Sequence, residues 1–125
     1  MNKTPTLMSL ALLVSCLGAT AHAQTDDGLA AVQALSTVNG QALACQAFKP
    51  AARAKTLMLA HAPRTAKFAD AYESGTQQAF GAQVNAMATC PDEAALSSQL
   101  DVLALRLQAA LPATEHPPIQ PNRPN

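Results

Sequence analysis

The stretch CPDEAALSSQLDVLALRLQAALP, residues 90–112, carries the most regular helical pattern of the chain. Pro91 suits the first position of a helix, and the two acidic residues that follow it suit the positive end of the helix dipole. Four leucines recur at helical spacing on one face: Leu96, Leu100, Leu103 and Leu107. We expect Val102 and Leu105 to widen that apolar face. The pattern predicts an amphipathic helix that ends at Pro112 and packs against other helices.

Cys90 directly precedes this helix, and the chain contains two further cysteines, Cys16 and Cys45. Cys16 lies in a leader segment. Its thiol is lost in either case, because the leader is cleaved off or Cys16 itself is lipid-modified. Cys45 and Cys90 remain as a pair in an exported chain, and the oxidising periplasm turns such pairs into disulfides. In the loop-entropy treatment, closing the loop between them is worth about 4 kcal/mol. We therefore predict a Cys45–Cys90 disulfide that strengthens a small helical domain.

The beginning of the chain, residues 1–23, has the order of a secretory signal peptide. Lys3 gives a positive start, an apolar run follows over residues 7–17, and Ala21-His22-Ala23 forms an A-x-A cleavage site. The run is shorter than the roughly 20 residues of a membrane-spanning helix. We predict cleavage after Ala23 and a periplasmic location. The alternative is a lipobox at residues 13–16, in which a lipid-modified Cys16 becomes the first residue and anchors the chain in the envelope.

Apolar periodicity and breaker residues predict further helices over residues 27–38, 41–48 and 50–61, and another in 64–88. Asn39-Gly40 is expected to end the first of these, because glycine suits the left-handed position after a helix. Pro50 is expected to break the next segment and to occupy the first position of the helix that follows.

The segment 64–88 carries two stripes at helical spacing. A bulky stripe, which we expect in the core, contains Phe68, Tyr72, Phe80, Val84 and Met87. A seam of small residues lies beside it and contains Ala71, Gly75, Ala79, Ala82 and Ala86. Because small side chains permit close approach, we expect a neighbouring helix to pack tightly on that seam.

These patterns predict an all-α protein with one domain over residues 24–111, built as a small bundle of four to five short helices. Aromatic residues make up only 3% of the chain, and alanine dominates its apolar fraction, so burial per residue is thin. The segment 112–125 holds five of the nine prolines and is expected to be a disordered tail.

Basic residues gather in one part of the sequence: Lys49, Arg53, Lys55, Arg64 and Lys67. No acidic residue lies among them, whereas Asp70, Glu73, Asp92, Glu93 and Asp101 follow. One interpretation is a basic face that binds an acidic protein, a polymer of the cell envelope or lipid headgroups. The alternative is two solvated helix faces that attract each other within the fold.

No constellation of residues indicates an enzyme, and we predict none. After removal of the leader, His61 and His116 are the only histidines, and no glycine-rich phosphate loop or zinc spacing is present. Met58 and His61 are three residues apart and could hold copper, but their apolar helix face favours a core contact, so we expect no metal and no cofactor. Removing Lys3 with the leader changes the formal net charge from 0 to −1, which argues against a nucleic-acid partner.

The segments Asn39–Cys45, Tyr72–Gly75 and Cys90-Pro91, with the leucines that follow, resemble small periplasmic immunity proteins. This resemblance implies a helical, disulfide-bridged protein that blocks peptidoglycan-cutting toxins delivered by type VI secretion. In architecture alone, the chain is similar to periplasmic acid-stress chaperones. We therefore expect a non-catalytic periplasmic protein that binds a protein or an envelope component. The alternatives are a stress chaperone or holdase, and an envelope protein anchored through Cys16.

Overall fold

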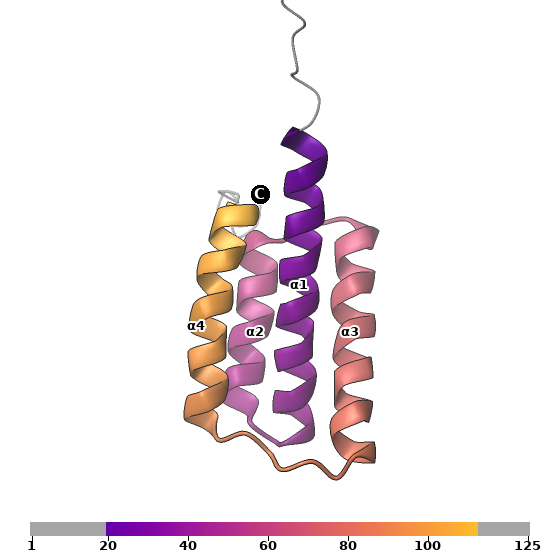
Figure 1. Ribbon diagram of the computed structural model, residues 1–125, viewed down its shortest axis with the longest axis vertical. Coiled ribbons are helices and arrows are strands. Elements are labelled where there is room, and N and C mark those ends of the chain that lie inside the picture. The colour runs from indigo at the N-terminus through magenta and orange to yellow at the C-terminus, as the bar shows by residue number, and fades with distance from the viewer. Residues whose placement is uncertain (1–19, 113–125) are drawn as a thin grey trace, which may run out of the picture.

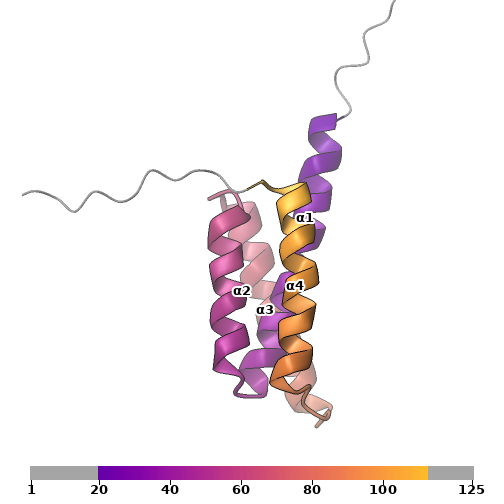
Figure 2. The same cartoon turned by 90° about the vertical axis from the view of Figure 1, so that its left-hand side faces the viewer.

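The computed structural model describes residues 20–112, and this part of the chain contains four α-helices and no strand. The helices are α1 (Thr20–Ala44), α2 (Phe48–His61), α3 (Ala66–Asn85) and α4 (Glu93–Ala110). They run alternately down and up, and α1 contacts each of the other three (Figure 1). In the view of Figure 2, α2 and α4 stand side by side in front of α3 and α1. The predicted all-helical bundle is therefore confirmed; Cys16, the apolar run 7–17 and the tail from residue 113 lie outside the described residues.

A single helix, α1, replaces the two helices predicted over 27–38 and 41–48. Gly40 does not end it, because this glycine keeps a negative φ and lies inside the helix, fully buried. An added Cβ at Gly40 would lie 2.7 Å from the Ala79 Cβ and 2.8 Å from the backbone nitrogen of Phe80. Gly40 therefore serves close packing against α3, and the prediction that it stops the helix was wrong.

The end of α1 is made by Gln46, which adopts the left-handed conformation with φ 57°. The Ala47 amide donates to the Ala42 carbonyl at 2.8 Å, and the Gln46 amide donates to the Leu43 carbonyl at 3.1 Å. These two bonds form a Schellman motif, which usually has glycine at the left-handed position. The break falls at residues 45–47 and not at Pro50, because α2 already begins at Phe48. Pro50 lies in the first turn of α2 and not at its first position as expected, and a missing amide hydrogen costs nothing there.

The core lies between α1, α2 and α4. Val32 and Leu35 of α1 and the predicted leucines Leu96, Leu100, Leu103 and Leu107 of α4 are buried. Val102 and Leu105 do not widen this face, because they are 67% and 69% exposed. Only the leucine face of α4 packs against the other helices, so Val102 and Leu105 point to solvent.

The α1–α3 contact depends on the seam of small residues. An added Cβ at Gly75 would collide with the Ser36 hydroxyl, and Ala79 meets Gly40. Asn39 adds a polar tie, donating from Nδ2 to the Thr76 hydroxyl at 3.1 Å. The expected tight approach at Gly75 and Ala79 is confirmed.

The bulky stripe of α3 was expected in the core, and this prediction was wrong for most of its length. Phe68 is buried and Tyr72 is half-buried, whereas Phe80, Val84 and Met87 are 43%, 51% and 90% exposed. Only one helix, α1, packs extensively on α3, and the small seam takes that contact. The bulky side chains are therefore rotated away from α1.

The predicted Cys45–Cys90 disulfide is present, with an S–S distance of 2.07 Å and a separation of 45 positions along the sequence. It joins the end of α1 to the segment before α4. Asp92, not Pro91, begins α4 as its N-cap: the Asp92 carboxylate accepts a hydrogen bond from the Ala95 amide at 2.7 Å. Pro91 therefore lies outside the helix, before the N-cap, and not at the first helical position that was expected.

Candidate functional site

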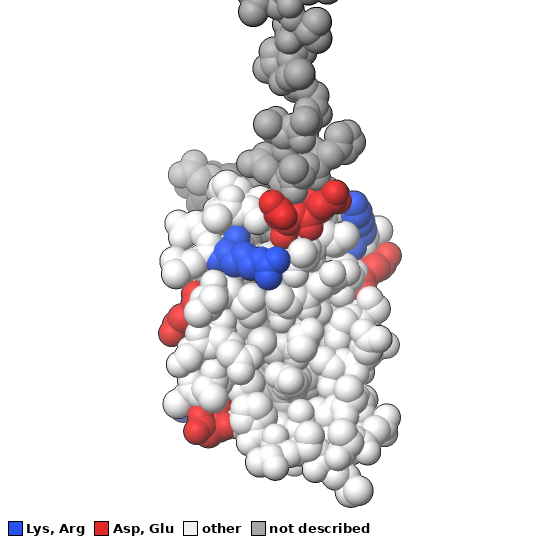
Figure 3. All heavy atoms as spheres, in the orientation of Figure 1, with Lys and Arg blue, Asp and Glu red and all other residues white. Residues whose placement is uncertain are grey.

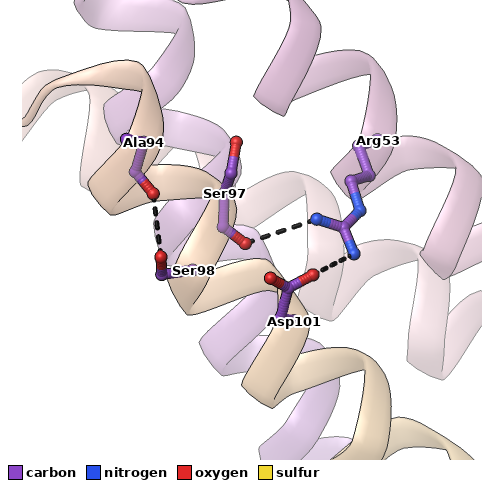
Figure 4. A network of polar contacts seen from close by, with 5 residues as sticks. All are labelled: Arg53, Ala94, Ser97, Ser98 and Asp101. Atoms are coloured by element: carbon purple, nitrogen blue, oxygen red, sulfur yellow. Dashed lines mark hydrogen bonds and ion pairs between the residues drawn. The ribbon is translucent and has the colours of Figure 1, made fainter.

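Two of the five basic residues proposed to bind a partner lie against α4 and form ion pairs within the fold. Arg53 donates to the Asp101 carboxylate at 2.6 Å and to the Ser97 carbonyl at 3.3 Å (Figure 4). The Lys49 ammonium lies 4.0 Å from the Glu93 carboxylate, with 91% and 56% of the two side chains exposed. These pairs match the interpretation in which the two charged faces attract each other, and exposed pairs of this kind contribute about 0–1 kcal/mol.

The other three basic residues are exposed and make no ion pair among residues 20–112. They do not form one patch. Lys55 lines a groove on α2 and Arg64 lines a neighbouring hollow, whereas Lys67 lies four residues before Ala71, on the opposite face of α3. On the face drawn in Figure 3, charged side chains lie in the upper part and along the two sides, and the broad middle is uncharged.

A groove with a volume of about 630 Å³ lies between α2 and α3. It exists because α2 and α3 pack on different sides of α1 and make no extensive contact with each other. Asn39 and Leu43 of α1 form its floor. Most of its lining is apolar. We call this hollow the α2–α3 groove.

The α2 wall of the groove presents Phe48, Met58 and Leu59. Phe48 is 67% exposed and Leu59 is 59% exposed. Large apolar side chains exposed together in one hollow are typical of an interaction surface. Sequence patterns did not single out Phe48 or Leu59, and they marked Met58 only as a neighbour of His61. Phe48 was expected at the end of the helix predicted over 41–48, and no periodicity assigns it to a surface.

The α3 wall presents Ala69, Tyr72, Glu73 and Thr76. Phe80 follows Thr76 by one helical turn, and Val84 follows Phe80 by another, so both continue this wall. The bulky stripe that α3 does not bury against α1 thus extends the groove. Five of the eight large apolar side chains that are exposed in residues 20–112 belong to this surface: Leu43, Phe48, Leu59, Phe80 and Val84.

Tyr72 lies in the α3 wall and has a clearly raised pKa. Its hydroxyl is buried and has no hydrogen-bond partner among the described residues. Burial raises the pKa of Tyr72 from 10.0 to about 12, because the charged phenolate loses water that nothing replaces. The ring lines the groove, while the hydroxyl adds a cost to the fold and no chemistry at neutral pH.

Residues that an acid–base mechanism would need are not brought together. Glu73 lines the groove, but His61 and Asp70 do not. His61 instead bonds through Nδ1 to the Leu111 carbonyl at 2.8 Å, which ties the end of α2 to the end of α4. Among the described residues, no three histidine, cysteine or acidic side chains come close enough to hold a metal ion.

The fold and the groove define a small four-helix protein with one disulfide and an open apolar surface groove. None of the helices in residues 20–112 has the length and hydropathy that crossing a bilayer requires. Comparison of the chain with protein-family models, with curated proteins and with solved structures gives no match.

Proposed function

We propose that this chain is an exported, non-catalytic protein that binds another protein through the α2–α3 groove. The observation that carries the proposal is the exposure of Phe48 and Leu59 in one groove, with Phe80 exposed one helical turn beyond Thr76 of the α3 wall. Exposing apolar side chains costs about 25 cal/mol per Å² relative to burying them, so a surface of this kind marks a binding site more often than chance.

The shape of the groove favours a helix as the bound element. Its two walls are helices, its floor is a helix, and its lining repeats at the spacing of helix faces. An amphipathic helix placed in such a groove buries its own apolar face against both walls at once. Lys55 on one wall and Glu73 on the other would then select the charges that flank this face.

A matched pair of leucines tests the proposal. Leu59 lies in the groove and is 59% exposed, whereas Leu105 lies on α4 and is 69% exposed. Proteins from a periplasmic extract are captured on each of three purified baits: Leu59→Asp, Leu105→Asp and the unaltered protein. The captured protein is then purified, and its dissociation constant for each bait is measured by calorimetry. We expect one partner that the unaltered protein and Leu105→Asp bind alike and that Leu59→Asp binds at least about tenfold more weakly, the effect of one desolvated apolar anchor.

The outcome also separates the kinds of binding protein that the sequence suggests. An immunity protein would retain a peptidoglycan-cutting enzyme and inhibit it in a stoichiometric titration. A holdase would retain many unrelated unfolded proteins. Equal binding by Leu59→Asp and the unaltered protein would contradict the groove as the site and would return attention to Lys55, Arg64 and Lys67.

The location of the protein is part of the same proposal. The Cys45–Cys90 disulfide supports an oxidising compartment, of which the periplasm is one. Cleavage after Ala23 would leave α1 to begin at or after Gln24, and lipidation would instead leave Cys16 as the first residue. The intact mass of the exported protein distinguishes these two forms, because a diacyl group adds a mass that cleavage after Ala23 cannot give.

A further inference from the structure

We propose that the groove is filled by α3 of a second copy of this chain, in a two-fold symmetric dimer. This inference rests on the proposed function, in that it names the first occupant of the same groove. In such a dimer, α3 of each protomer lies in the α2–α3 groove of the other. The same surface of each protomer therefore supplies both the inserted helix and the groove that receives it. A contact of this type closes after two copies.

The exposure of α3 is the first observation that favours a second copy. α3 has a single buried residue, Phe68, and packs extensively on α1 alone. Its outward face carries Phe80 and Val84, which are 43% and 51% exposed. The chain therefore presents an apolar helical ridge directly beside a groove that fits a helix.

The register of the two walls is the second observation. Met58 and Leu59 of α2 and Ala69 of α3 line one hollow at the upper end of the groove, so these residues share a level. α2 and α3 run in opposite directions (Figure 1). One turn below that level, Lys55 on α2 therefore lies opposite Glu73 on α3.

Two further turns down, the same register places Phe48 of α2 at the level of Phe80 of α3. An aromatic residue thus ends each wall of the groove at one height. A two-fold axis parallel to the helices keeps every residue at its own level while it exchanges the two walls.

Such an axis places Lys55 of one protomer beside Glu73 of the second copy, and Phe48 beside the second copy's Phe80. Both contacts occur twice, because the symmetry repeats them. Lys55 and Glu73 make no ion pair within residues 20–112, so each is free to meet an opposite charge. This face is self-complementary in charge, which identifies a second copy as its occupant.

Sedimentation velocity over a range of protein concentrations tests the dimer. We expect unaltered protein and Leu105→Asp to form dimers, and Leu59→Asp to remain monomeric at concentrations where the others associate. Circular dichroism checks that each variant keeps its helices. A monomer at every concentration, or equal loss with Leu59→Asp and Leu105→Asp, would refute the inference.

Charge exchange tests the symmetry itself. Lys55→Glu and Glu73→Lys each replace two attractive contacts with two repulsive ones, so each alone should raise the dimer dissociation constant by about tenfold or more. An equimolar mixture of these two variants should associate as the unaltered protein does, since each then meets its opposite charge twice. Only contacts between protomers can give this recovery, and its absence would overturn the proposed arrangement.

The dimer and the proposed function fail in different ways. A monomeric protein whose partner binding is still lost in Leu59→Asp would refute the dimer and support the proposed function. A dimer that Leu59→Asp dissociates, in a chain that retains no other protein, would support the dimer and refute the binding of a different partner.

Discussion

Replacing Gly40 with alanine should destabilise the fold, whereas the same substitution at Gly81 should stabilise it. Both glycines lie inside helices, so alanine gains about 1 kcal/mol of helix propensity at either position. At Gly81 an added Cβ meets nothing within 4 Å. At Gly40 it would lie 2.7 Å from the Ala79 Cβ, 2.8 Å from the Phe80 nitrogen and closer still to the Thr76 carbonyl.

The size of the effect follows from these distances. Non-bonded carbon atoms at their best separation stand roughly 3.5–4.0 Å apart, so α1 and α3 would have to separate by about 1 Å. Two of the obstructing groups are backbone atoms, which cannot turn aside as a long side chain can. Overpacking of this kind costs about 1–3 kcal/mol. Because the gain in helix propensity is the same at both positions, Gly40→Ala should lie about 1–3 kcal/mol below Gly81→Ala in unfolding free energy.

Urea unfolding followed by far-ultraviolet circular dichroism measures this difference, with the disulfide intact and all samples at one protein concentration. The free energy of unfolding should fall less in Gly75→Ala than in Gly40→Ala, because the added Cβ at Gly75 would meet only the Ser36 side chain, whose hydroxyl can rotate. Equal stability of Gly40→Ala and Gly81→Ala would refute the close α1–α3 packing. It would also remove the reason why Phe80 faces the groove.

Three further changes test the rest of the fold. Tyr72→Phe should raise the unfolding free energy by about 1 kcal/mol, because it removes a buried hydroxyl without a partner. In unaltered protein the folded state keeps a phenolic proton, with a pKa of about 12, that the unfolded chain loses from pH 10.0 upward. Stability should therefore fall between those pH values, and less so in Tyr72→Phe; an identical fall in both would contradict the burial. Replacing Cys45 and Cys90 with serine should lower the unfolding free energy by up to about 4 kcal/mol, and no change in urea midpoint would show that the bridge does not brace the bundle. Met87→Gly should raise it by about 1 kcal/mol, because Met87 has φ 46° and is 90% exposed; lower stability would mean that the methionine makes contacts worth more than its strain.

The sequence alone predicts an element correctly where a single physical requirement determines its position. Leucines at a spacing of three and four residues place α4 correctly, because one apolar face is all that the helix needs. Cys45 and Cys90 are the two cysteines outside the predicted leader, and the structure joins them. The buried leucine face of α4 and the disulfide are confirmed, whereas the export from which the disulfide was predicted stays a prediction.

The boundaries failed where a residue had two physical roles. Gly40 can end a helix by adopting a positive φ, or it can stay helical and permit close contact with another helix. The second role depends on the position of Thr76 and Ala79, some forty residues away, and local patterns do not contain that position. Gln46 shows the reverse case: a residue with no glycine-like freedom ends α1, since the chain must turn there to bring α2 back.

The groove was missed for a related reason. α3 carries a bulky stripe and a small seam, and periodicity alone does not say which of them faces α1. Bulky side chains bury more area, so we assigned Phe80 and Val84 to the core. Gly40 on α1 and Gly75 on α3 favour packing through the small seam instead, because two surfaces of small residues let the helix backbones approach closely and a bulky stripe does not.

The same choice of packing accounts for both the thin core and the exposed surface. Turning the seam of α3 inward leaves Phe80 and Val84 outside, beside the walls that Phe48 and Leu59 already line. If the apolar surface were only an accident of a poor core, substitutions that fill or charge it would be neutral or would improve solubility without other effect. If it is a binding surface, a charge at Leu59 must disrupt an association that a charge at Leu105 leaves unchanged. The stability of Gly40→Ala tests the close packing of α3 on α1, and the association of Leu59→Asp tests the apolar surface that this packing leaves exposed.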